Sequence, residues 1–230
     1  MSALPRSPRT TDDAELADGI SAGALALGLD LPAAAVAHLV AYIRLIERWN
    51  GTYNLTAIRD ARDMATQHIV DCLAAAAALL RCRDLPTGAH VLDVGSGAGL
   101  PGLVFAIAAP GIEVTCIDSV GKKAAFMTHA VSALGIRNVV VSHGRVEAMR
   151  DAHFDVIASR AFASLQDFIR GTAHLLGLGG IWMALKGKEP RDELERLQNV
   201  SFHVEPLRVP GLKADRCVIW LKPIEASARL

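Results

Sequence analysis

The 230-residue chain has little of what usually marks a metalloprotein or a disulfide-stapled secreted protein. Only four residues are cysteine, and no two of them form a C-x-x-C pair. This spacing gives no sign of a zinc site or a disulfide framework, and buried reduced thiols are typical of a cytoplasmic protein. Among the histidines we single out His68, because Asp71 lies three positions further along the same predicted helix and shares its face. We therefore expect no bound metal.

The chain also lacks an excess of either charge. Lys and Arg together number 24, as do Asp and Glu, which argues against a protein that coats nucleic acid or membrane by bulk charge. The longest uncharged run, residues 94–112, is interrupted by glycine and proline and bounded by Asp93 and Glu113, so we expect no membrane span. Pro, Ser, Thr and Asp fill residues 1–18, which predicts a disordered tail rather than a signal peptide.

Two further motifs are missing. The sequence contains neither a G-x-S-x-G elbow nor a P-loop, so no motif indicates a hydrolase or a kinase.

Aliphatic residues are plentiful, since 51% of the chain is hydrophobic but only 5% aromatic. Residues 32–49 repeat apolar side chains at helical spacing, which predicts an amphipathic helix. Asp60 can cap a second helix whose buried side holds Met64, Ile69, Leu73, Ala76 and Leu80. We therefore predict an N-terminal helical extension over residues 19–86.

From His90 onward short β-rich runs alternate with helical segments, which is typical of a parallel sheet covered on both faces. A single α/β domain with seven strands is therefore predicted over residues 87–230, and its last two strands should pair antiparallel at the end of the sheet. The expected strands lie near 90–95, 112–118, 138–142, 154–159, 180–186, 201–208 and 216–222, and the expected helices near 101–109, 121–135, 164–176 and 189–198.

A cluster of glycines follows the first of these strands, and it can be interpreted in two registers. In one, Asp93 precedes Gly95, Gly97 and Gly99; in the other, Gly97-x-Gly99-x-x-Gly102 satisfies the dinucleotide fingerprint. The second register leaves two residues between the strand and its first glycine, where the dinucleotide turn normally begins at once. We favour the first register, with Asp93 either holding the turn or meeting a cationic ligand.

Two later strand ends carry residues suited to an adenosine. Asp118 ends the second strand about twenty residues after the turn, where an acid can accept hydrogen bonds from both ribose hydroxyls. After the third strand, Val146 and Glu147 stand where an adenine could be sandwiched and its amino group bonded. A helix cap for Asp118 and a surface turn for Val146-Glu147 remain alternatives.

Cations follow the fourth and fifth strands at the same predicted edge. Arg160 lies in Ser159-Arg160-Ala-Phe162, and Lys186-Gly187-Lys188 closes the fifth strand. Together with Lys122 and Lys123 they suggest an anionic or electron-rich substrate, since open α/β sheets bind ligands at the carboxyl ends of their strands.

Taken in order, these motifs make the chain resemble the bacterial 16S rRNA guanine-N7 methyltransferases, the family also called glucose-inhibited division protein B. The resemblance runs from about Trp49 to Arg216. It rests on Trp49-Asn50, Tyr53-Asn-Leu-Thr56, His68-Ile-x-Asp71, Asp93-Val-Gly-Ser-Gly-Ala-Gly-Leu-Pro-Gly102, Asp118-Ser119, Arg145-Val-Glu147, Ser159-Arg-Ala-Phe-Ala163 and Ala184-Leu-Lys-Gly187.

The resemblance implies a class I S-adenosylmethionine-dependent methyltransferase fold, Rossmann-like and mostly parallel, with the N-terminal helical extension. The implied activity is methylation of N7 of a guanine in the decoding-region (530) loop of 16S rRNA, in the cytoplasm, with the small ribosomal subunit as partner. The residues that we expect to bind S-adenosylmethionine are Asp93, Gly95, Gly97, Gly99, Leu100, Asp118, Ser119, Val146, Glu147 and Arg160.

We expect the substrate side to be formed by five residues, of which we predict Arg160, Lys186, Asn54 and His68 to be catalytic. Arg160 and Lys186 would hold the phosphate backbone or the O6 edge of the guanine, and Asn54 and His68, with Thr56, would shape the entrance for the base. Two other hypotheses remain: an NAD(P)-dependent oxidoreductase that uses the second glycine register, and a non-catalytic rRNA-binding assembly factor.

Overall fold

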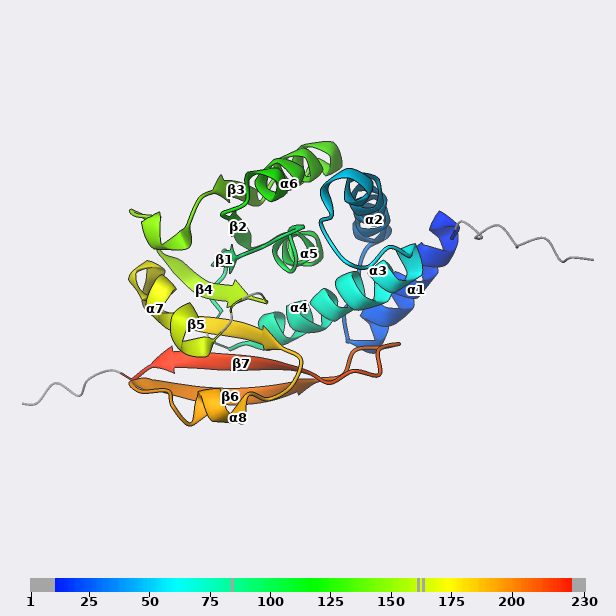
Figure 1. The fold of residues 1–230 in the computed structure, drawn as a ribbon. Coiled ribbons are helices and arrows are strands. Elements are labelled where there is room, and N and C mark those ends of the chain that lie inside the picture. The colour runs from blue at the N-terminus through cyan, green and yellow to red at the C-terminus, as the bar shows by residue number, and fades with distance from the viewer. Residues whose placement is uncertain (1–10, 84, 161, 163, 225–230) are drawn as a thin grey trace, which may run out of the picture.

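A seven-stranded sheet runs through the middle of the molecule in the order β3-β2-β1-β4-β5-β7-β6 (Figure 1). The computed structural model describes residues 11–83, 85–160, 162 and 164–224. β1 to β5 are parallel, whereas β7 runs antiparallel to both β5 and β6. The predicted mostly parallel sheet and its antiparallel end are thus confirmed. The strands are β1 (His90–Val94), β2 (Glu113–Asp118), β3 (Val139–His143), β4 (Phe154–Ser159), β5 (Leu176–Lys186), β6 (Val200–Leu207) and β7 (Arg216–Pro223).

Hydrophobic clusters cover both faces of the central strands, and side chains alternate between these faces along each strand. Val91 of β1 faces the larger hydrophobic cluster, which also contains buried residues of α1, α2, α4, α5 and α6. Leu92 faces the smaller cluster on the other side, together with Phe168 of α7 and Leu194 of α8. The helical extension therefore shares one core with the sheet. The bounds are α1 (Asp13–Ala26), α2 (Ala33–Tyr53), α4 (Asp71–Arg81), α5 (Gly102–Ala108), α6 (Gly121–Leu134), α7 (Leu165–Thr172) and α8 (Arg191–Leu194).

The first helix corrects the predicted tail. α1 begins at Asp13, inside the stretch of residues 1–18 for which we expected disorder. Its start is stabilised by the side chain of Asp12, which accepts a hydrogen bond from the amide of Ala14, and Leu16 and Ile20 are buried. Because the first turn of α1 is polar, its sequence resembles a disordered tail, whereas tertiary contacts hold the helix in place. Residues 1–10 lie outside the described residues.

The second predicted helix begins after Asp60 as expected, but its helical geometry changes along its length. Asp60 caps α3 (Ala61–Met64), and a π-helical stretch η1 (Ala65–Val70) follows. α4 (Asp71–Arg81) continues directly from η1, and we call the two together the η1–α4 rod. Four of the five residues expected on its buried side are buried, whereas Leu80 is exposed. Leu80 lies next to the last residue of the helix. No sequence pattern signalled the π-helical stretch.

Two other helices are shorter than predicted. The segment expected at 164–176 forms α7, capped by Ser164, and then a 3₁₀ turn η3 (Ala173–Leu175) before β5 begins at Leu176. The segment expected at 189–198 forms only the single turn α8, in which Leu194 is the one buried residue. With so little apolar surface to bury, a longer helix would lack tertiary support.

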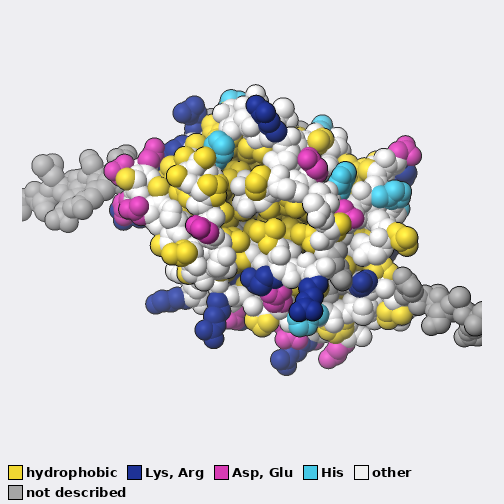
Figure 2. Space-filling model, turned by 180° about the vertical axis from the view of Figure 1, so that it is seen from behind, with side chains coloured by type: hydrophobic (Ala, Val, Ile, Leu, Met, Phe, Trp, Pro, Cys, Tyr) yellow, Lys and Arg dark blue, Asp and Glu magenta, His cyan; other side chains and the backbone are white. Residues whose placement is uncertain are grey.

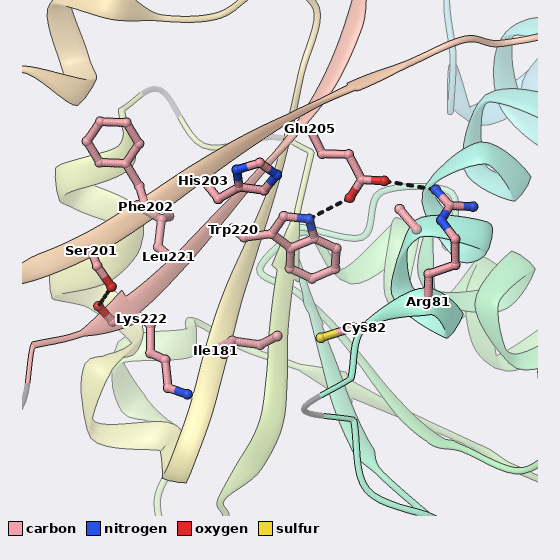
Figure 3. A pocket seen from close by; sticks show the side chains of 11 residues that line it. Arg81, Cys82, Ile181, Ser201, Phe202, His203, Glu205, Trp220, Leu221 and Lys222 are labelled. Carbon is pink, nitrogen blue, oxygen red and sulfur yellow. Dashed lines mark hydrogen bonds and ion pairs between the residues drawn. The ribbon is translucent and has the colours of Figure 1, made fainter.

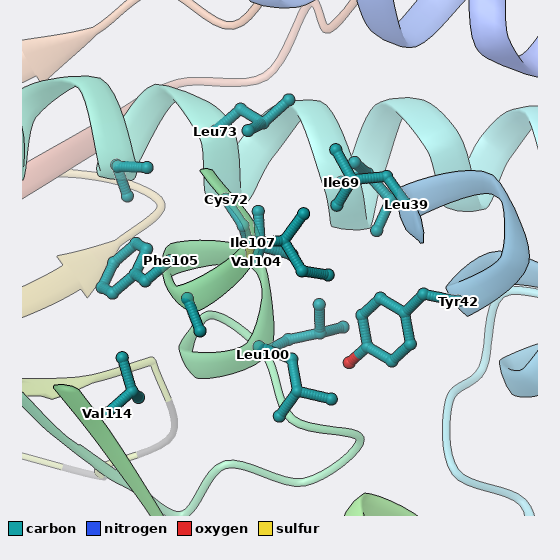
Figure 4. Close-up of a cluster of buried hydrophobic side chains, with 14 of the residues drawn as sticks. Leu39, Tyr42, Ile69, Cys72, Leu73, Leu100, Val104, Phe105, Ile107 and Val114 are labelled. Carbon is teal, nitrogen blue, oxygen red and sulfur yellow. The ribbon is translucent and has the colours of Figure 1, made fainter. Parts of the chain in front are cut away.

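The core around α5 is mostly aliphatic, as the composition predicts, with Tyr42 and Phe105 as buried aromatic members. Figure 4 shows Leu100, Val104 and Ile107 meeting Leu39 and Tyr42 of α2 and Leu73 of α4. The Tyr42 hydroxyl donates a hydrogen bond to the carbonyl of Ala98, inside the glycine turn. The helical extension thereby fixes the turn at the end of β1.

The surface carries intermingled charges. On the face seen in Figure 2, Lys and Arg side chains gather mostly toward the lower part, where Figure 1 places the β6–β7 side, with Asp and Glu interspersed. No helix among the described residues is long and apolar enough to cross a membrane.

Candidate active site

The carboxyl ends of β1, β2, β4 and β5 meet at one edge of the sheet, because these strands are parallel and neighbouring. Two adjacent cavities open there. We call the one beside β1, β2 and the turn after β3 the cofactor cavity, and the one between β5, β7 and the η1–α4 rod the substrate cavity.

The glycine turn after β1 is tied to the neighbouring strand. Gly97 has a φ of +63°, a left-handed conformation that favours glycine, and its amide donates to Asp118 Oδ2 at 2.9 Å. The other oxygen, Oδ1, accepts from the amide of Val120 at 2.8 Å, and Lys123 Nζ lies 3.8 Å from Oδ2. Asp118 therefore joins the glycine turn to the start of α6.

Asp93 lies directly beneath the turn and is completely buried. Its Oδ2 accepts a hydrogen bond from the amide of Gly102 at 2.9 Å, whereas Oδ1 has no partner among the described residues. Burial raises the pKa of Asp93 to about 6, although the bond from Gly102 lowers it. A side chain at Gly102 would collide with Cys116 Sγ, because a Cβ there would lie 2.4 Å from it.

The cofactor cavity has a volume of about 390 Å³ and brings together five of the predicted cofactor residues. They are Gly95, Asp118, Ser119, Val146 and Glu147. Phe162 also lines it, a residue that we had not assigned to the cofactor. The predicted residues that do not line it are Asp93, Gly97, Gly99, Leu100 and Arg160.

Leu100 and Gly99 pack in the hydrophobic core and do not line the cofactor cavity. The Leu100 side chain is buried beside Tyr42 and α5 (Figure 4). A Cβ on Gly99 would lie 2.7 Å from Leu103 and 3.0 Å from the Tyr42 hydroxyl, so the close approach of α2 requires glycine there. The side chain of Leu100 therefore does not face the cavity.

These residues fit an adenosine-containing cofactor that carries an amino group. The cavity volume is within the usual range for small-ligand sites, about 300–1,000 Å³. Asp118 supplies carboxylate oxygens, Val146 an apolar wall and Glu147 an exposed acid at the turn after β3. The unpartnered oxygen of Asp93 is a further acceptor behind the turn.

The substrate cavity has a volume of about 420 Å³ and brings together three of the four predicted catalytic residues, His68, Arg160 and Lys186. Asp71 and Arg216 line it as well. Asn54 is absent from its walls: it ends α2 in a left-handed conformation with φ of +48° and is exposed. Its part in shaping the entrance for the base stays a prediction.

Asp71 holds two arginines in this cavity. Its Oδ1 accepts from Arg216 Nε at 2.9 Å, and its Oδ2 lies 3.7 Å from Arg160. Burial raises the pKa of Asp71, while the two guanidinium groups lower it. Sequence reasoning paired Asp71 with His68 and missed Arg216, because β7 and α4 are far apart along the chain.

His68 instead contacts the loop that follows α2. Its Nε2 lies 2.7 Å from Thr56 Oγ1, and Nδ1 lies 3.2 Å from the carbonyl of Gln67. Burial, together with the charge of Arg160, lowers the pKa of His68 to about 4, so its ring is neutral at pH 7. Asn50 binds the same loop, accepting from the amide of Thr56 and donating to the carbonyl of Ile58.

Lys186 lies between the two cavities. Its Nζ contacts Glu193 Oε1 at 3.3 Å and donates to the carbonyl of Phe162 at 3.5 Å. Phe162 lines the cofactor cavity and Lys186 the substrate cavity. The end of β4 thus separates two neighbouring ligand spaces.

A third cavity lies away from this edge and contains none of the predicted site residues. Arg81, Cys82, Ile181 and Trp220 line it near the end of α4 (Figure 3). Glu205 there accepts hydrogen bonds from both Arg81 and the Trp220 indole. This arrangement joins α4 to the outer strands. No group of three or more potential metal ligands occurs among the residues that the structure covers.

The sequence matches one protein family. A family model described as GidB, rRNA small subunit methyltransferase G, matches residues 35–219. Ribosomal RNA small subunit methyltransferase G of Paracidovorax citrulli is 47% identical over 216 residues, covering 89% of this chain and 88% of that protein. The protein of the same name from Polaromonas naphthalenivorans is 50% identical over 210 residues, covering 89% and 95%.

Solved structures support the fold. TrmN from Thermus thermophilus superposes with a TM-score of 0.53 at 22% identity, covering 69% of this chain and 53% of that one. The ribosomal protein L11 methylase of Lactobacillus delbrueckii subsp. bulgaricus gives a TM-score of 0.52 at 17% identity, covering 66% and 77%. These similarities concern the fold alone, which is that of Rossmann-like methyltransferases.

Proposed function

Since the chain belongs to the rRNA small subunit methyltransferase G family, we propose that it transfers a methyl group from S-adenosylmethionine to N7 of a guanine in the 530 loop of 16S rRNA. The family match over residues 35–219 carries this proposal, because it spans most of the extension and both cavities. The substrate is the rRNA of the small ribosomal subunit, in the cytoplasm.

The cofactor cavity would hold S-adenosylmethionine. Asp118 would bind the ribose, Val146 and Glu147 the adenine, and Gly95 and Ser119 would line the space between them. Asp93 would contribute its unpartnered oxygen to the positively charged amino group. Gly97 takes part indirectly, since its amide orients Asp118. The bound cofactor supplies an electrophilic methyl group.

The residues of the substrate cavity have no proton to remove, because guanine N7 carries a lone pair and no hydrogen. Their contribution is to position the base, which can account for several kcal/mol of a reaction barrier. Arg160 and Lys186 would contact the phosphate backbone or the O6 edge. His68 stays neutral at pH 7 and shapes the cavity through its contact with Thr56.

The geometry argues against the dinucleotide alternative. In the register Gly97-x-Gly99-x-x-Gly102, the second glycine, Gly99, would let the backbone approach a pyrophosphate. In the structure that close approach is made by two buried side chains, because a Cβ on Gly99 would lie 2.7 Å from Leu103 and 3.0 Å from the Tyr42 hydroxyl. A pyrophosphate at Gly99 would have to displace this packing.

Methyl transfer to small subunits, followed by mapping of the modified nucleotide, tests the function directly. We expect one methylated guanine in the 530 loop when small subunits from cells that lack this protein are used as substrate. Absence of any transfer would favour a non-catalytic assembly factor.

Two substitutions separate the cavities. We expect Asp118→Ala to weaken cofactor binding by at least about tenfold in calorimetry, since a charge-assisted hydrogen bond contributes about 1.5–3 kcal/mol. Lys186→Gln should lower methylation while cofactor affinity stays unchanged. Glu193→Gln is its control, because it removes the carboxylate that contacts Lys186 and keeps the cation. Equal loss of cofactor binding in Lys186→Gln would reject its substrate role.

A further inference from the structure

A fourth space, which we call the basic groove, continues from the substrate cavity along the outer strands. It has a volume of about 730 Å³, and four of its lining residues, Gly187, Leu207, Arg216 and Cys217, also line the substrate cavity. A ligand larger than one base in the substrate cavity would therefore extend into the groove.

One wall of the groove is the connection between β6 and β7, residues 208–215, and this wall is held in place. Val209 is buried against Val70 and Ala74 of the η1–α4 rod. Thr66 Oγ1 and Cγ2 lie within 4.0 Å of where a Cβ on Gly211 would be. The connection is thus fixed to the helical extension, and the groove keeps its shape without a ligand.

The charge of the groove is uneven. Its lining includes four cations and two carboxylates, Lys188, Arg191, Arg208 and Arg216 against Glu189 and Asp215. Arg191 lies 3.7 Å from Glu189, and Arg216 is bound to Asp71. Lys188 and Arg208 are exposed and make no hydrogen bond or ion pair with any residue that the structure describes. Lys213, in the same connection, is exposed and without such a partner too.

We propose that the basic groove holds the rRNA strand flanking the target guanine, with Lys188 and Arg208 each contacting a phosphate. This inference rests on the proposed function, since the target base must occupy the adjoining substrate cavity. The groove also has an apolar lining, which includes Val204, Pro206 and Leu212, and such a lining suits the faces of sugars or bases. Cations beside an apolar surface are the combination that binds single-stranded nucleic acid.

The experiment compares two double variants that lose the same net charge. Lys188→Gln/Arg208→Gln removes the unpartnered cations of the groove. Arg83→Gln/Arg137→Gln is the control: both arginines are exposed, neither has a partner among the described residues, and Arg137 precedes β3 at the edge opposite the strands' carboxyl ends. Binding to protein-free 16S rRNA is measured at several salt concentrations, and methylation kinetics at about 150 mM salt.

We expect the groove variant to reduce the slope of log K against log[salt] by about 1.4, since each phosphate contact to a single strand contributes about 0.7. Its KM for rRNA should rise about tenfold at ~150 mM salt for the same reason. Its kcat and its affinity for S-adenosylmethionine should not change, and the control variant should match wild type.

Three results would overturn the proposal: an unchanged salt slope, an equal loss in the control variant, or loss of binding to intact small subunits with normal binding to protein-free rRNA. The last would assign the groove to a ribosomal protein. Failure of the proposed function is distinguishable, because it would show as wild-type protein that transfers no methyl group. If the groove proposal alone is wrong, wild-type protein will still methylate rRNA, and the groove variant and the control variant will be equally active.

Discussion

At the scale of single residues, the two carboxylate oxygens of Asp93 have different roles. Oδ2 accepts from the amide of Gly102 and so fixes the start of α5, while Oδ1 remains buried without a protein partner. A buried carboxylate with an unused acceptor is unfavourable in isolation. Its presence behind the glycine turn is consistent with a cationic group completing the site.

Asp93→Asn should change the pH dependence of stability. The folded pKa of about 6 lies above the ordinary value of 3.8, so wild type loses stability as the pH rises from about 4 through 6. Asparagine does not ionise and keeps an oxygen for Gly102. The variant's stability relative to wild type should therefore increase by up to about 3 kcal/mol between pH 4 and 7. Urea unfolding at several pH values measures this; a difference independent of pH would contradict it.

The ionisation of His68 makes stability depend on pH with the opposite sign. Its folded pKa of about 4 lies below the ordinary 6.5, so wild type loses stability as the pH falls from about 6.5 through 4. In His68→Gln this loss should vanish, which makes the variant relatively more stable at pH 4 than at pH 7, by on the order of 3 kcal/mol. The same unfolding series tests it. A constant offset from wild type across this window would reject the assignment.

At the scale of elements, Asp71 is the contact that joins the η1–α4 rod to β7 and to the end of β4. Asp71→Asn should destabilise the protein by about 1–3 kcal/mol, because it removes a hydrogen-bonded carboxylate from two partly exposed arginines. A double-mutant cycle with Arg216→Gln isolates the pair; we expect a coupling energy of at least about 0.5 kcal/mol. Additive effects would show that the pair contributes nothing of its own.

The spacing of apolar residues predicted the helices and strands well, because apolar side chains recur on the buried face of each element. All seven predicted strands are present, although β5 begins at Leu176 and not near residue 180, and α2, α5 and α6 lie within a few residues of their predicted bounds. The errors lie where tertiary contacts override local pattern. α1 begins inside the predicted tail, and α8 has too few apolar residues to extend.

The candidate site was predicted in part for a related reason. Residues at strand ends, such as Asp118, Glu147 and Arg160, are placed by topology alone once the sheet is known. Arg216 and Asn54 depend on how β7 and the end of α2 are oriented in three dimensions. Thr56 and His68 were expected at one entrance through the resemblance, and they are in contact, but the π-helical stretch that carries His68 has no sequence signature.

At the scale of the whole molecule, cofactor binding should stabilise the folded chain. At a concentration of 100 times Kd, S-adenosylmethionine should add about 2.7 kcal/mol. For a protein of this size that corresponds to a rise in Tm of about 5–10 °C. Differential scanning calorimetry with S-adenosylmethionine and, separately, NAD and NADP compares the two cofactor classes. A rise with the nicotinamide cofactors alone would reverse the assignment.

The bond from the Tyr42 hydroxyl to the carbonyl of Ala98 has a consequence for how the chain unfolds. The extension and the sheet share one core, and this bond joins the extension to the glycine turn itself. Loss of α2 would therefore release the turn that shapes the cofactor cavity. The protein should melt in one cooperative transition, and a fragment beginning at residue 87 should neither hold the turn nor remain monodisperse.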